Sequence, residues 1–335
     1  MPFYRHLLWP FAAVYGFVVW FRNRLFDWGV LSSESFNVPV ICVGNLETGG
    51  TGKSPVVLHI LELLLNAGKR PVVLSRGYGR KSKGYRLVGI NDLAENVGDE
   101  PLQAKLRFPE IPVVVCENRV EAIERINSEL DVDVVVMDDG FQHRWVKPSL
   151  SVLVTRAEFP FWKNHLLPVG TLREEIAEAT RADAVVQIGV GKRAELAGIL
   201  SFDAKAVTGD LIQFSGSNRS LDNIKNVMLF SGIANAERFE NCTSQTLNVL
   251  HHLRFSDHHN YAISDLKLLR KKMDSFGASV DALVTTEKDA ARLRNQKQLK
   301  ELYTVPVFYL PLNLKFDENQ KREFEKLILR NGKYA

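Results

Sequence analysis

Cysteine is scarce in this chain. Its 335 residues include three cysteines, Cys42, Cys116 and Cys242, which lie far apart and form neither a CxxC pair nor a zinc-binding spacing. An odd number of scattered cysteines excludes a disulfide framework. Such usage is typical of reduced thiols in a reducing cytosol.

Neither sign of charge is in large excess. The formal net charge is +4, charged residues make up 24% and hydrophobic residues 45%. Dedicated nucleic-acid binders usually carry a stronger and clustered positive charge, so we expect no nucleic-acid partner, and we infer no obligate protein partner. The composition is that of an ordinary globular protein, and the length allows two domains with buried cores.

The apolar amino-terminal segment is too short to span a membrane readily. Residues 7–21, LLWPFAAVYGFVVWF, carry no charge and include Pro10, whereas a spanning helix needs roughly 20 apolar residues. No small-residue cleavage site follows, so a removable signal peptide fits poorly. Two interpretations remain, a buried core helix and an interfacial helix. Tryptophan and tyrosine rings with flanking Arg22 and Arg24 favour the interfacial one.

Short β-branched runs alternate with helical stretches from Val38 onward. The expected strands cover residues 38–45, 71–75, 111–118, 132–139, 149–155 and 182–189. The expected helices run from near Pro55 to Gly68, near 101–107 and over 119–130. Strands that are apolar without strict alternation are typical of a parallel sheet covered by helices on both faces.

A domain boundary is expected after a polar stretch at 214–223. The α/β pattern restarts at 226–234, continues through 265–276, 282–290 and 305–312, and ends in a charged amphipathic helix. We therefore predict a membrane-interface helix over 1–30, an α/β core domain over 31–214 and a smaller α/β domain with a terminal helix over 215–335.

A glycine-rich motif, GGTGKS, lies between the first expected strand and its helix. Backbone amides of such a loop can point at phosphate oxygens, Lys53 can reach the β and γ phosphates, and the Ser54 hydroxyl can bind Mg²⁺. The residues expected to hold ATP are Gly49, Gly50, Thr51, Gly52, Lys53 and Ser54. The core is thus predicted to be a P-loop NTPase-like sheet, although Glu47 stands where the usual pattern has glycine.

Two adjacent carboxylates end the strand VVVMDDG. The carboxyl ends of parallel strands are where such sheets bind ligands, so Asp138 and Asp139 are candidate Mg²⁺ ligands in the manner of a Walker B acid. Which of the two contacts the metal directly is left open. The alternative is a pair of acids that cap a turn before Gly140.

The group that accepts the phosphoryl group is less clearly marked. The loop RGYGRKSKGYR, residues 76–86, is basic and glycine-rich, and it can hold an anionic acceptor, lie solvated at the surface or touch nucleic acid. Candidate proton-transfer groups are less certain: GDEP places Asp99 and Glu100 at a helix start, where carboxylates also act as caps. FSDHHNY places Asp257, His258 and His259 on a polar turn, where the paired histidines are either surface residues or a weak metal site.

The motifs together resemble the tetraacyldisaccharide 4′-kinases of Gram-negative bacteria over nearly the whole chain. The segments that carry the resemblance are VGNLETGGTGKSP, SRGYGR, VGDEP, CENR, MDDGFQH, LLPVGTLRE, FSGIA, FSDHHNY and TTEKDA. The resemblance implies transfer of the ATP γ-phosphoryl group to the 4′-hydroxyl of a tetraacylated glucosamine disaccharide 1-phosphate, which gives lipid IVA in lipid A biosynthesis. It also implies a peripheral enzyme on the cytoplasmic face of the inner membrane.

The resemblance also implies roles for particular residues. Asp99 and His258 would form a proton-accepting dyad, with His259 as the alternative histidine, while Arg173 and Glu174 would approach phosphates and metal. The remaining implied substrate contacts are Arg76, Tyr78, Arg80, Asn118, Arg119 and Gln142. Two rival functions are a membrane-associated regulatory ATPase, which would want a second lysine that GNLETGG does not offer, and a soluble small-molecule kinase.

Overall fold

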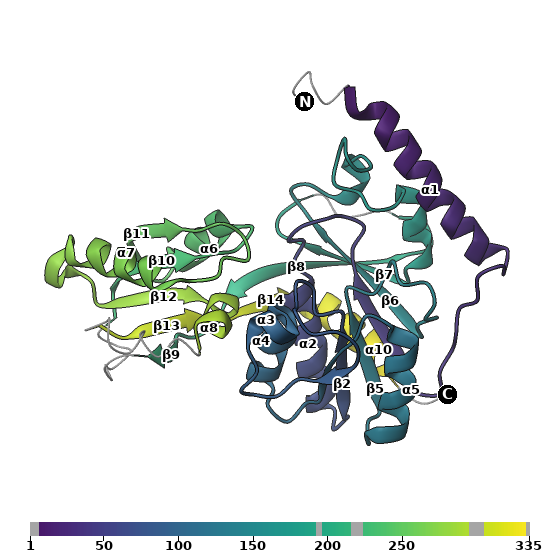
Figure 1. Cartoon of the computed structure of the whole chain (residues 1–335), viewed down its shortest axis with the longest axis horizontal. Coiled ribbons are helices and arrows are strands. Elements are labelled where there is room, and N and C mark those ends of the chain that lie inside the picture. Colours follow the sequence, from purple (N-terminus) through teal and green to yellow (C-terminus); the bar gives the residue numbers. More distant parts are fainter. Residues whose placement is uncertain (1–6, 192–195, 216–223, 295–304, 333–335) are drawn as a thin grey trace.

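Two β-sheets organise the molecule (Figure 1). The computed structural model describes residues 7–191, 196–215, 224–294 and 305–332, and within these ranges it contains a nine-stranded and a five-stranded sheet. Figure 1 shows the smaller sheet and its helices to one side of the larger unit. The strand order is β14-β8-β7-β6-β1-β5-β2-β4-β3 in the larger sheet and β11-β10-β12-β13-β9 in the smaller.

The larger sheet is parallel except at its two edges. Its strands are β1 (Val40–Gly44), β2 (Pro71–Ser75), β3 (Arg86–Leu87), β4 (Val113–Val115), β5 (Val134–Asp138), β6 (Leu150–Arg156), β7 (Ala184–Ile188), β8 (Leu200–Thr208) and β14 (Leu312–Phe316). Only β3 and β14 pair antiparallel. The predicted parallel sheet flanked by helices is therefore confirmed; five of its strands lie within the segments expected from their apolar runs, and β6 extends one residue beyond its expected segment.

Helices cover both faces of this sheet. Successive residues of each strand point to opposite faces, and both sets are buried against helices. In β1, Ile41 and Val43 belong to a core built with α2 (Lys53–Asn66), α4 (Asp99–Arg107) and α10 (Glu318–Asn331). Val40 and Cys42 pack on the opposite side with α5 (Arg119–Glu129). Burial on both faces explains why these strands lack polar alternation.

The remaining helices and strands lie mostly in the smaller unit. Its strands are β9 (Ile212–Ser215), β10 (Asn226–Ser231), β11 (Asn248–Arg254), β12 (Ala282–Thr286) and β13 (Val307–Leu310). Its helices are α6 (Ala236–Thr243), α7 (Ile263–Asp274), the 3₁₀ turn η5 (Gly277–Ser279) and α8 (Glu287–Leu293). The larger unit also contains α3 (Ala94–Val97) and the 3₁₀ turns η2 (Phe161–Lys163) and η3 (Ile176–Arg181).

The end of the chain returns to the larger sheet. β14 pairs with β8, and Phe324 and Ile328 of α10 are buried in the core against α2. The sequence analysis had assigned this terminal helix to the smaller unit, so the structure corrects that point. The sequence pattern cannot show the return, because β13 and β14 follow one another almost without a break and read as one apolar run. Most of the predicted boundary segment, 216–223, lies outside the described residues.

The first helix, α1 (Trp9–Asp27), lies along the outside of the larger unit (Figure 1). Ala12, Gly16 and Phe26 are buried against the protein, whereas Phe11, Val14 and Phe17 are each more than 60% exposed. In the described part of the chain, no helix combines the length and the apolar character that crossing a membrane requires. The helix therefore has one face docked on the protein and a large apolar face left uncovered.

Candidate active site

The glycine-rich loop connects β1 to α2 at the carboxyl end of the parallel sheet. Gly52 has φ +98° and immediately precedes α2, and a Cβ at this position would lie 2.6 Å from Cδ1 of Ile188. Glycine is therefore required both for the backbone conformation and for the close approach. The helix begins at Lys53, so the loop meets the positive end of a helix dipole, which is a favourable place for an anion.

Glu47, the departure from the usual loop pattern, anchors the start of the loop. It is 1% exposed, accepts a hydrogen bond from Asn164 Nδ2 at 2.8 Å and bridges to Leu172. The bridge to Leu172 is a main-chain pairing, whereas the hydrogen bond from Asn164 needs the Glu47 carboxylate and is one that a glycine could not accept. The side chain thus ties the loop to the segment that also carries Arg173.

Lys53 and Arg173 converge on Asp139 and Asn45. Lys53 Nζ lies 3.2 Å from Asn45 Oδ1 and 3.5 Å from Asp139 Oδ1, and Arg173 Nη2 lies 2.9 Å from Asp139 Oδ1. Burial raises the pKa of Asp139, but the charges of Lys53 and Arg173 outweigh it and lower that pKa to about 2. Asp139 is therefore ionised between these two cations, which lie beside the loop where phosphate recognition needs positive charge.

Ser54 points to a carboxylate on the other side of the loop. Its Oγ donates a hydrogen bond of 2.6 Å to Glu100 Oε1, and Lys288 Nζ donates one of 2.7 Å to the same oxygen. Burial opposes ionisation of Glu100, but the charges of Lys288 and Lys53 lower its pKa to about 2. Glu100 is thus an ionised acceptor for the Ser54 proton.

Asp138 completes a small polar space beside Ser54. Ser54, Glu100 and Asp138 line one cavity of about 10 Å³, and Asp138 Oδ1 is buried without a hydrogen-bond partner among the described residues. Burial, followed by the charges of Glu100 and Asp139, raises the pKa of Asp138 to about 7. A carboxylate oxygen and a hydroxyl that face one space fit Mg²⁺, which is usually bound by one or two protein ligands together with substrate phosphates.

The second half of the site is an acid–histidine pair that joins the two units. Asp99 Oδ2 lies 2.6 Å from His258 Nδ1 and also accepts a 2.6 Å hydrogen bond from Arg292 Nη2. Burial raises the pKa of Asp99, but hydrogen bonds from His258 and Arg292 outweigh it and hold that pKa well below its usual range. His259 instead lies 2.9 Å from Asp265, so the structure selects His258 as the partner of Asp99.

Backbone strain marks two of these residues. In the described part of the chain, the non-glycine residues with positive φ are Asp139, at 49°, and His258, at 56°. A side chain in this region costs of the order of 1 kcal/mol or more, and such residues cluster at functional sites. Both were candidate site residues on sequence grounds.

Two of the predicted substrate contacts lie beside the His258 ring or next to the glycine-rich loop. Tyr78 is 79% exposed and its ring centroid lies 6.2 Å from that of His258, and Arg76 is also exposed. Gln142 Nε2 donates to the carbonyl oxygen of Asn45 at 2.9 Å, while its Oε1 has no partner among the described residues. Tyr78 therefore lies beside the His258 ring, and Gln142 contacts the backbone just before the loop.

Three other predicted contacts have roles within the fold. The Arg80 guanidinium donates to Glu117 Oε1 and to the carbonyl of Gly84, each at 2.7 Å, and so closes the basic loop on itself. Asn118 caps α5 by accepting from the amide of Glu121. Arg119 is 3% exposed, and burial together with the charge of Arg76 lowers its pKa.

Glu174 lies apart from the carboxylates near Ser54. It is fully buried and paired with Arg181, and burial raises its pKa despite that charge. No group of three possible metal-binding side chains occurs in the described ranges, so Glu174 does not join Asp138 and Asp139 in such a cluster. Arg181 contacts Oε2 of Glu174, while Oε1 is buried without a hydrogen-bond partner among the described residues, and a metal contact of Glu174 stays a prediction.

Sequence reasoning did not assign roles to Asn45, Glu100, Lys288 or Arg292. The GDEP motif marks Glu100 as a candidate proton-transfer group or a helix cap but not as a partner of Ser54, and Asn45 lies just before the loop. Lys288 and Arg292 come from or follow TTEKDA, a motif that was noted without a role. Only the three-dimensional contact between α4 and α8 brings these side chains to the loop.

Fold and site define an α/β protein with a polar site suited to phosphate at the carboxyl ends of its parallel strands, and helix α8 and the turn at His258 of the smaller unit contribute side chains to this site. A family model described as tetraacyldisaccharide-1-P 4′-kinase matches residues 4–331. The chain belongs to this family.

Similar proteins agree over nearly the full length. Tetraacyldisaccharide 4′-kinases from Bacteroides thetaiotaomicron and Flavobacterium johnsoniae are each 35% identical to the chain, over 96% and 98% of it and 92% and 97% of their own lengths. The solved structure of LpxK from Aquifex aeolicus in complex with ATP superposes with a TM-score of 0.80 at 30% identity and covers 99% of both chains.

Proposed function

We propose that the protein transfers the γ-phosphoryl group of ATP to the 4′-hydroxyl of a tetraacylated glucosamine disaccharide 1-phosphate, forming lipid IVA at the cytoplasmic face of the inner membrane. Family membership supports the reaction, and the solved relative in complex with ATP supports the donor. The P-loop interpretation rests on the glycine-rich loop between β1 and α2, with Lys53 and Ser54 at the start of the helix.

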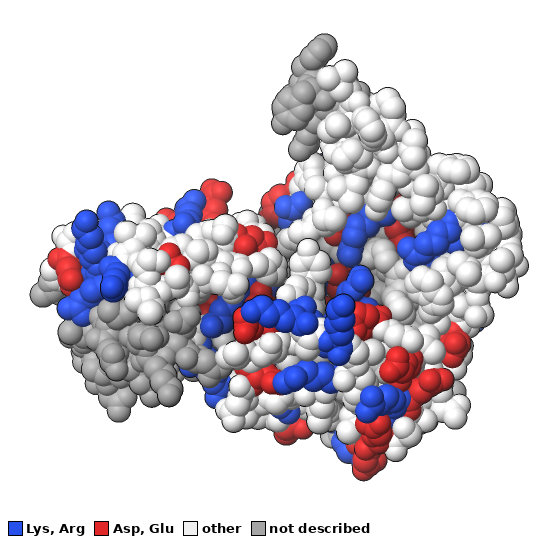
Figure 2. Space-filling view, viewed as in Figure 1, with Lys and Arg blue, Asp and Glu red and all other residues white. Residues whose placement is uncertain are grey.

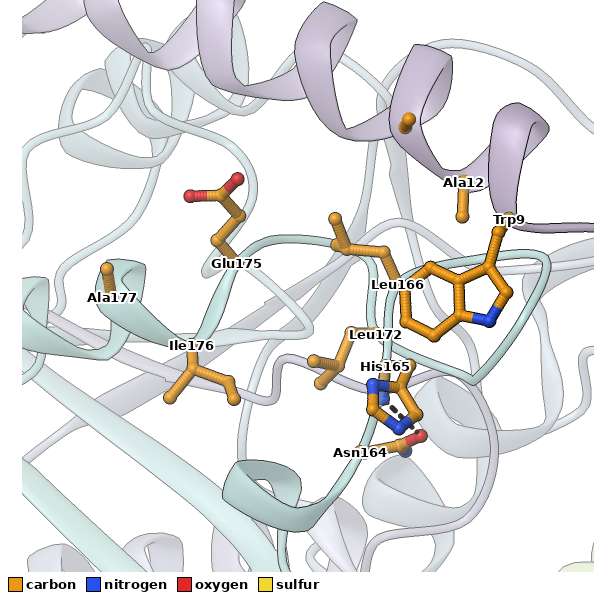
Figure 3. Close-up of a pocket in the computed structure, with 10 residues that line it drawn as sticks. Trp9, Ala12, Asn164, His165, Leu166, Leu172, Glu175, Ile176 and Ala177 are labelled. Carbon is orange, nitrogen blue, oxygen red and sulfur yellow. Dashed lines mark hydrogen bonds between the residues drawn. The ribbon is translucent and has the colours of Figure 1, made fainter. Parts of the chain in front are cut away.

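The observation that supports a lipid acceptor is an apolar cavity whose lining comes in part from the segment 164–177, which also carries Arg173. A cavity of about 440 Å³ opens between α1 and the segment 164–177, and Figure 3 shows Trp9 and Leu166 at its α1 end and Leu172 and Ile176 further along. Leu172 precedes Arg173, which contacts Asp139. A lipid can therefore place apolar groups in the cavity while its headgroup reaches the phosphate loop.

Charge is arranged in agreement with this division. Figure 2 shows charged side chains around the junction of the two units, whereas most of the visible surface of α1 is uncharged, the exposed charges of α1 being Arg24 and Asp27 near its end. A headgroup phosphate would meet Arg76 and the other cations of the junction. The apolar face of α1 would then rest on lipid, which favours the interfacial interpretation of this helix.

The residues divide the chemistry between them. The sugar hydroxyl attacks the γ-phosphorus, the bond to the β–γ bridging oxygen breaks, and ADP leaves. Lys53 and Arg173 stabilise charge on the transferred group, and His258 accepts the hydroxyl proton while Asp99 fixes the orientation of its ring. Mg²⁺ bound near Ser54 and Asp138 would neutralise phosphate charge.

The decisive experiment is phosphate transfer from γ-labelled ATP to purified tetraacyldisaccharide 1-phosphate in detergent. We expect a labelled lipid to form in proportion to ADP. ADP release without labelled lipid would instead favour a regulatory ATPase. Phosphate transfer to a water-soluble sugar as efficient as transfer to the lipid would favour a soluble small-molecule kinase.

Membrane association should depend on the exposed face of α1. Replacing Val14 and Phe17 together by serine is expected to reduce co-flotation with anionic liposomes, because it removes two highly exposed apolar side chains without touching the docked face. Val190→Ser with Leu268→Ser, two exposed positions elsewhere, serves as the matched control. Equal flotation of both double variants would place the anchor outside α1.

The acid limb of activity should follow His258. Its hydrogen bond with Asp99 raises the pKa of the imidazole, and only the neutral ring can accept a proton. Activity is therefore expected to fall with decreasing pH at a higher pH than an unperturbed histidine would give. Asp99→Asn should move this limb of the kcat/KM profile to lower pH, and an unmoved limb would assign it to another group.

A further inference from the structure

Helix α8 of the smaller unit holds the beginning of α4 in the larger unit. Arg292 binds Asp99, Lys288 binds Glu100 at 2.7 Å, and Glu287 accepts from Gln103 at 2.6 Å. Three side chains from one short helix thus form hydrogen bonds with three residues in the first half of α4. The Arg292 contact belongs to the acid–histidine pair, whereas the Lys288 contact leads to the phosphate loop.

The Lys288 contact continues directly to Ser54. Both the Lys288 ammonium and the Ser54 hydroxyl donate to the same oxygen, Glu100 Oε1. A hydroxyl that binds a metal through its oxygen lone pairs must direct its proton elsewhere, and a carboxylate is a strong acceptor for it. The Lys288 side chain is 25% exposed, so its bond to Glu100 is partly shielded from water.

We propose that Lys288 is a positioning residue that holds Glu100 against the Ser54 proton and thereby turns the Ser54 lone pairs toward the nucleotide-bound Mg²⁺. The proposal rests on the proposed function, since it concerns the same nucleotide site. Lys288 comes from the smaller unit, so the orientation of Ser54 in the larger unit depends on the contact between α4 and α8. Nucleotide-bound Mg²⁺ is then held well only when the two units are docked.

The test measures binding rather than turnover. Affinity of the full chain for a fluorescent non-hydrolysable ATP analogue is determined without lipid, once with Mg²⁺ and once with EDTA. For Lys288→Ala we expect the gain in affinity due to Mg²⁺ to fall about 10–100-fold, the usual effect of losing a group that orients a metal ligand. Affinity in EDTA should stay at the wild-type value.

Two further variants make the assignment specific. Lys288→Arg should retain most of the Mg²⁺-dependent gain, because a guanidinium can still donate to Glu100. Lys267→Ala, an exposed lysine on α7, is the matched control and should bind as the wild type does. The double variant Glu100→Ala/Lys288→Ala should lose no more than the worse single one, since the residues act in series.

Other outcomes overturn the proposal. An equal loss of affinity with Mg²⁺ and with EDTA would show that Lys288 contacts phosphate itself, and no loss would show that Ser54 needs no such support. If thermal unfolding shows that Lys288→Ala is not folded, Glu100→Gln/Lys288→Met replaces it, because this variant removes both charges with little change of side-chain shape. It should show the same loss of the Mg²⁺-dependent gain in affinity. A wild-type chain without Mg²⁺-dependent nucleotide binding would instead refute the proposed function.

Discussion

Lys53→Ala is expected to lower turnover by about 10² or more while the protein remains folded. Lys53 emerges at the first residue of α2 beside the glycine-rich loop, and its ammonium lies among polar atoms of Asn45 and Asp139 rather than in the apolar core. Its loss removes charge that stabilises the transferred phosphoryl group. Asp139 keeps its ion pair with Arg173, so little stability should be lost.

The measurement is phosphate transfer to lipid at saturating ATP, together with the thermal unfolding midpoint. Lys53→Met separates charge from side-chain length and should be as impaired as Lys53→Ala, while Lys267→Ala should behave as the wild type. Activity of either Lys53 variant above about a tenth of wild type would contradict the assignment of this loop to phosphate binding.

The fold was largely predictable because strands that are buried on both faces consist of continuous apolar residues, and these runs are visible in the sequence. Ile41 and Val43 face one core and Val40 and Cys42 the other, so every position of β1 must be apolar. The course of the final segment was not predictable in this way. β14 is an edge strand whose partner, β8, lies about a hundred residues earlier, and no local pattern encodes such a pairing.

The part of the site that consists of short contiguous motifs was predictable. Lys53, Ser54, Asp138 and Asp139 each follow a strand or begin a helix, and the topology of a parallel sheet brings such ends together. Glu100 and Lys288 were missed because their function depends on a contact between two units. The ion pair between Glu174 and Arg181 could not be predicted, because no local pattern records which buried carboxylate meets which arginine.

Replacing Asp99 or His258 by alanine is expected to reduce kcat by roughly 10²–10⁴, the usual contribution of general acid–base catalysis. The two side chains are 2.6 Å apart although 159 positions separate them in the chain. A sugar hydroxyl has a pKa far above 7, so it gains from an acceptor placed beside it as it attacks phosphorus. ATP affinity should change much less, because neither side chain belongs to the phosphate loop.

The double variant distinguishes a coupled pair from two independent residues. Asp99 orients the His258 ring and stabilises its protonated form, so Asp99→Ala/His258→Ala should cost little more than the worse single replacement. Multiplicative losses in kcat would show that the two residues act separately. His259→Ala is the matched control, since His259 pairs with Asp265 and should retain most activity.

Arg292 makes the dyad dependent on the docking of the two units. It is buried, donates to Asp99 from α8 and also binds the carbonyl of Gly232, which accepts from the amide of His258. Arg292→Lys keeps the charge but cannot reach both acceptors with the same fork, so it should lower kcat while leaving ATP affinity near the wild-type value. A loss confined to the KM for lipid would mean that Arg292 binds the acceptor and does not orient Asp99.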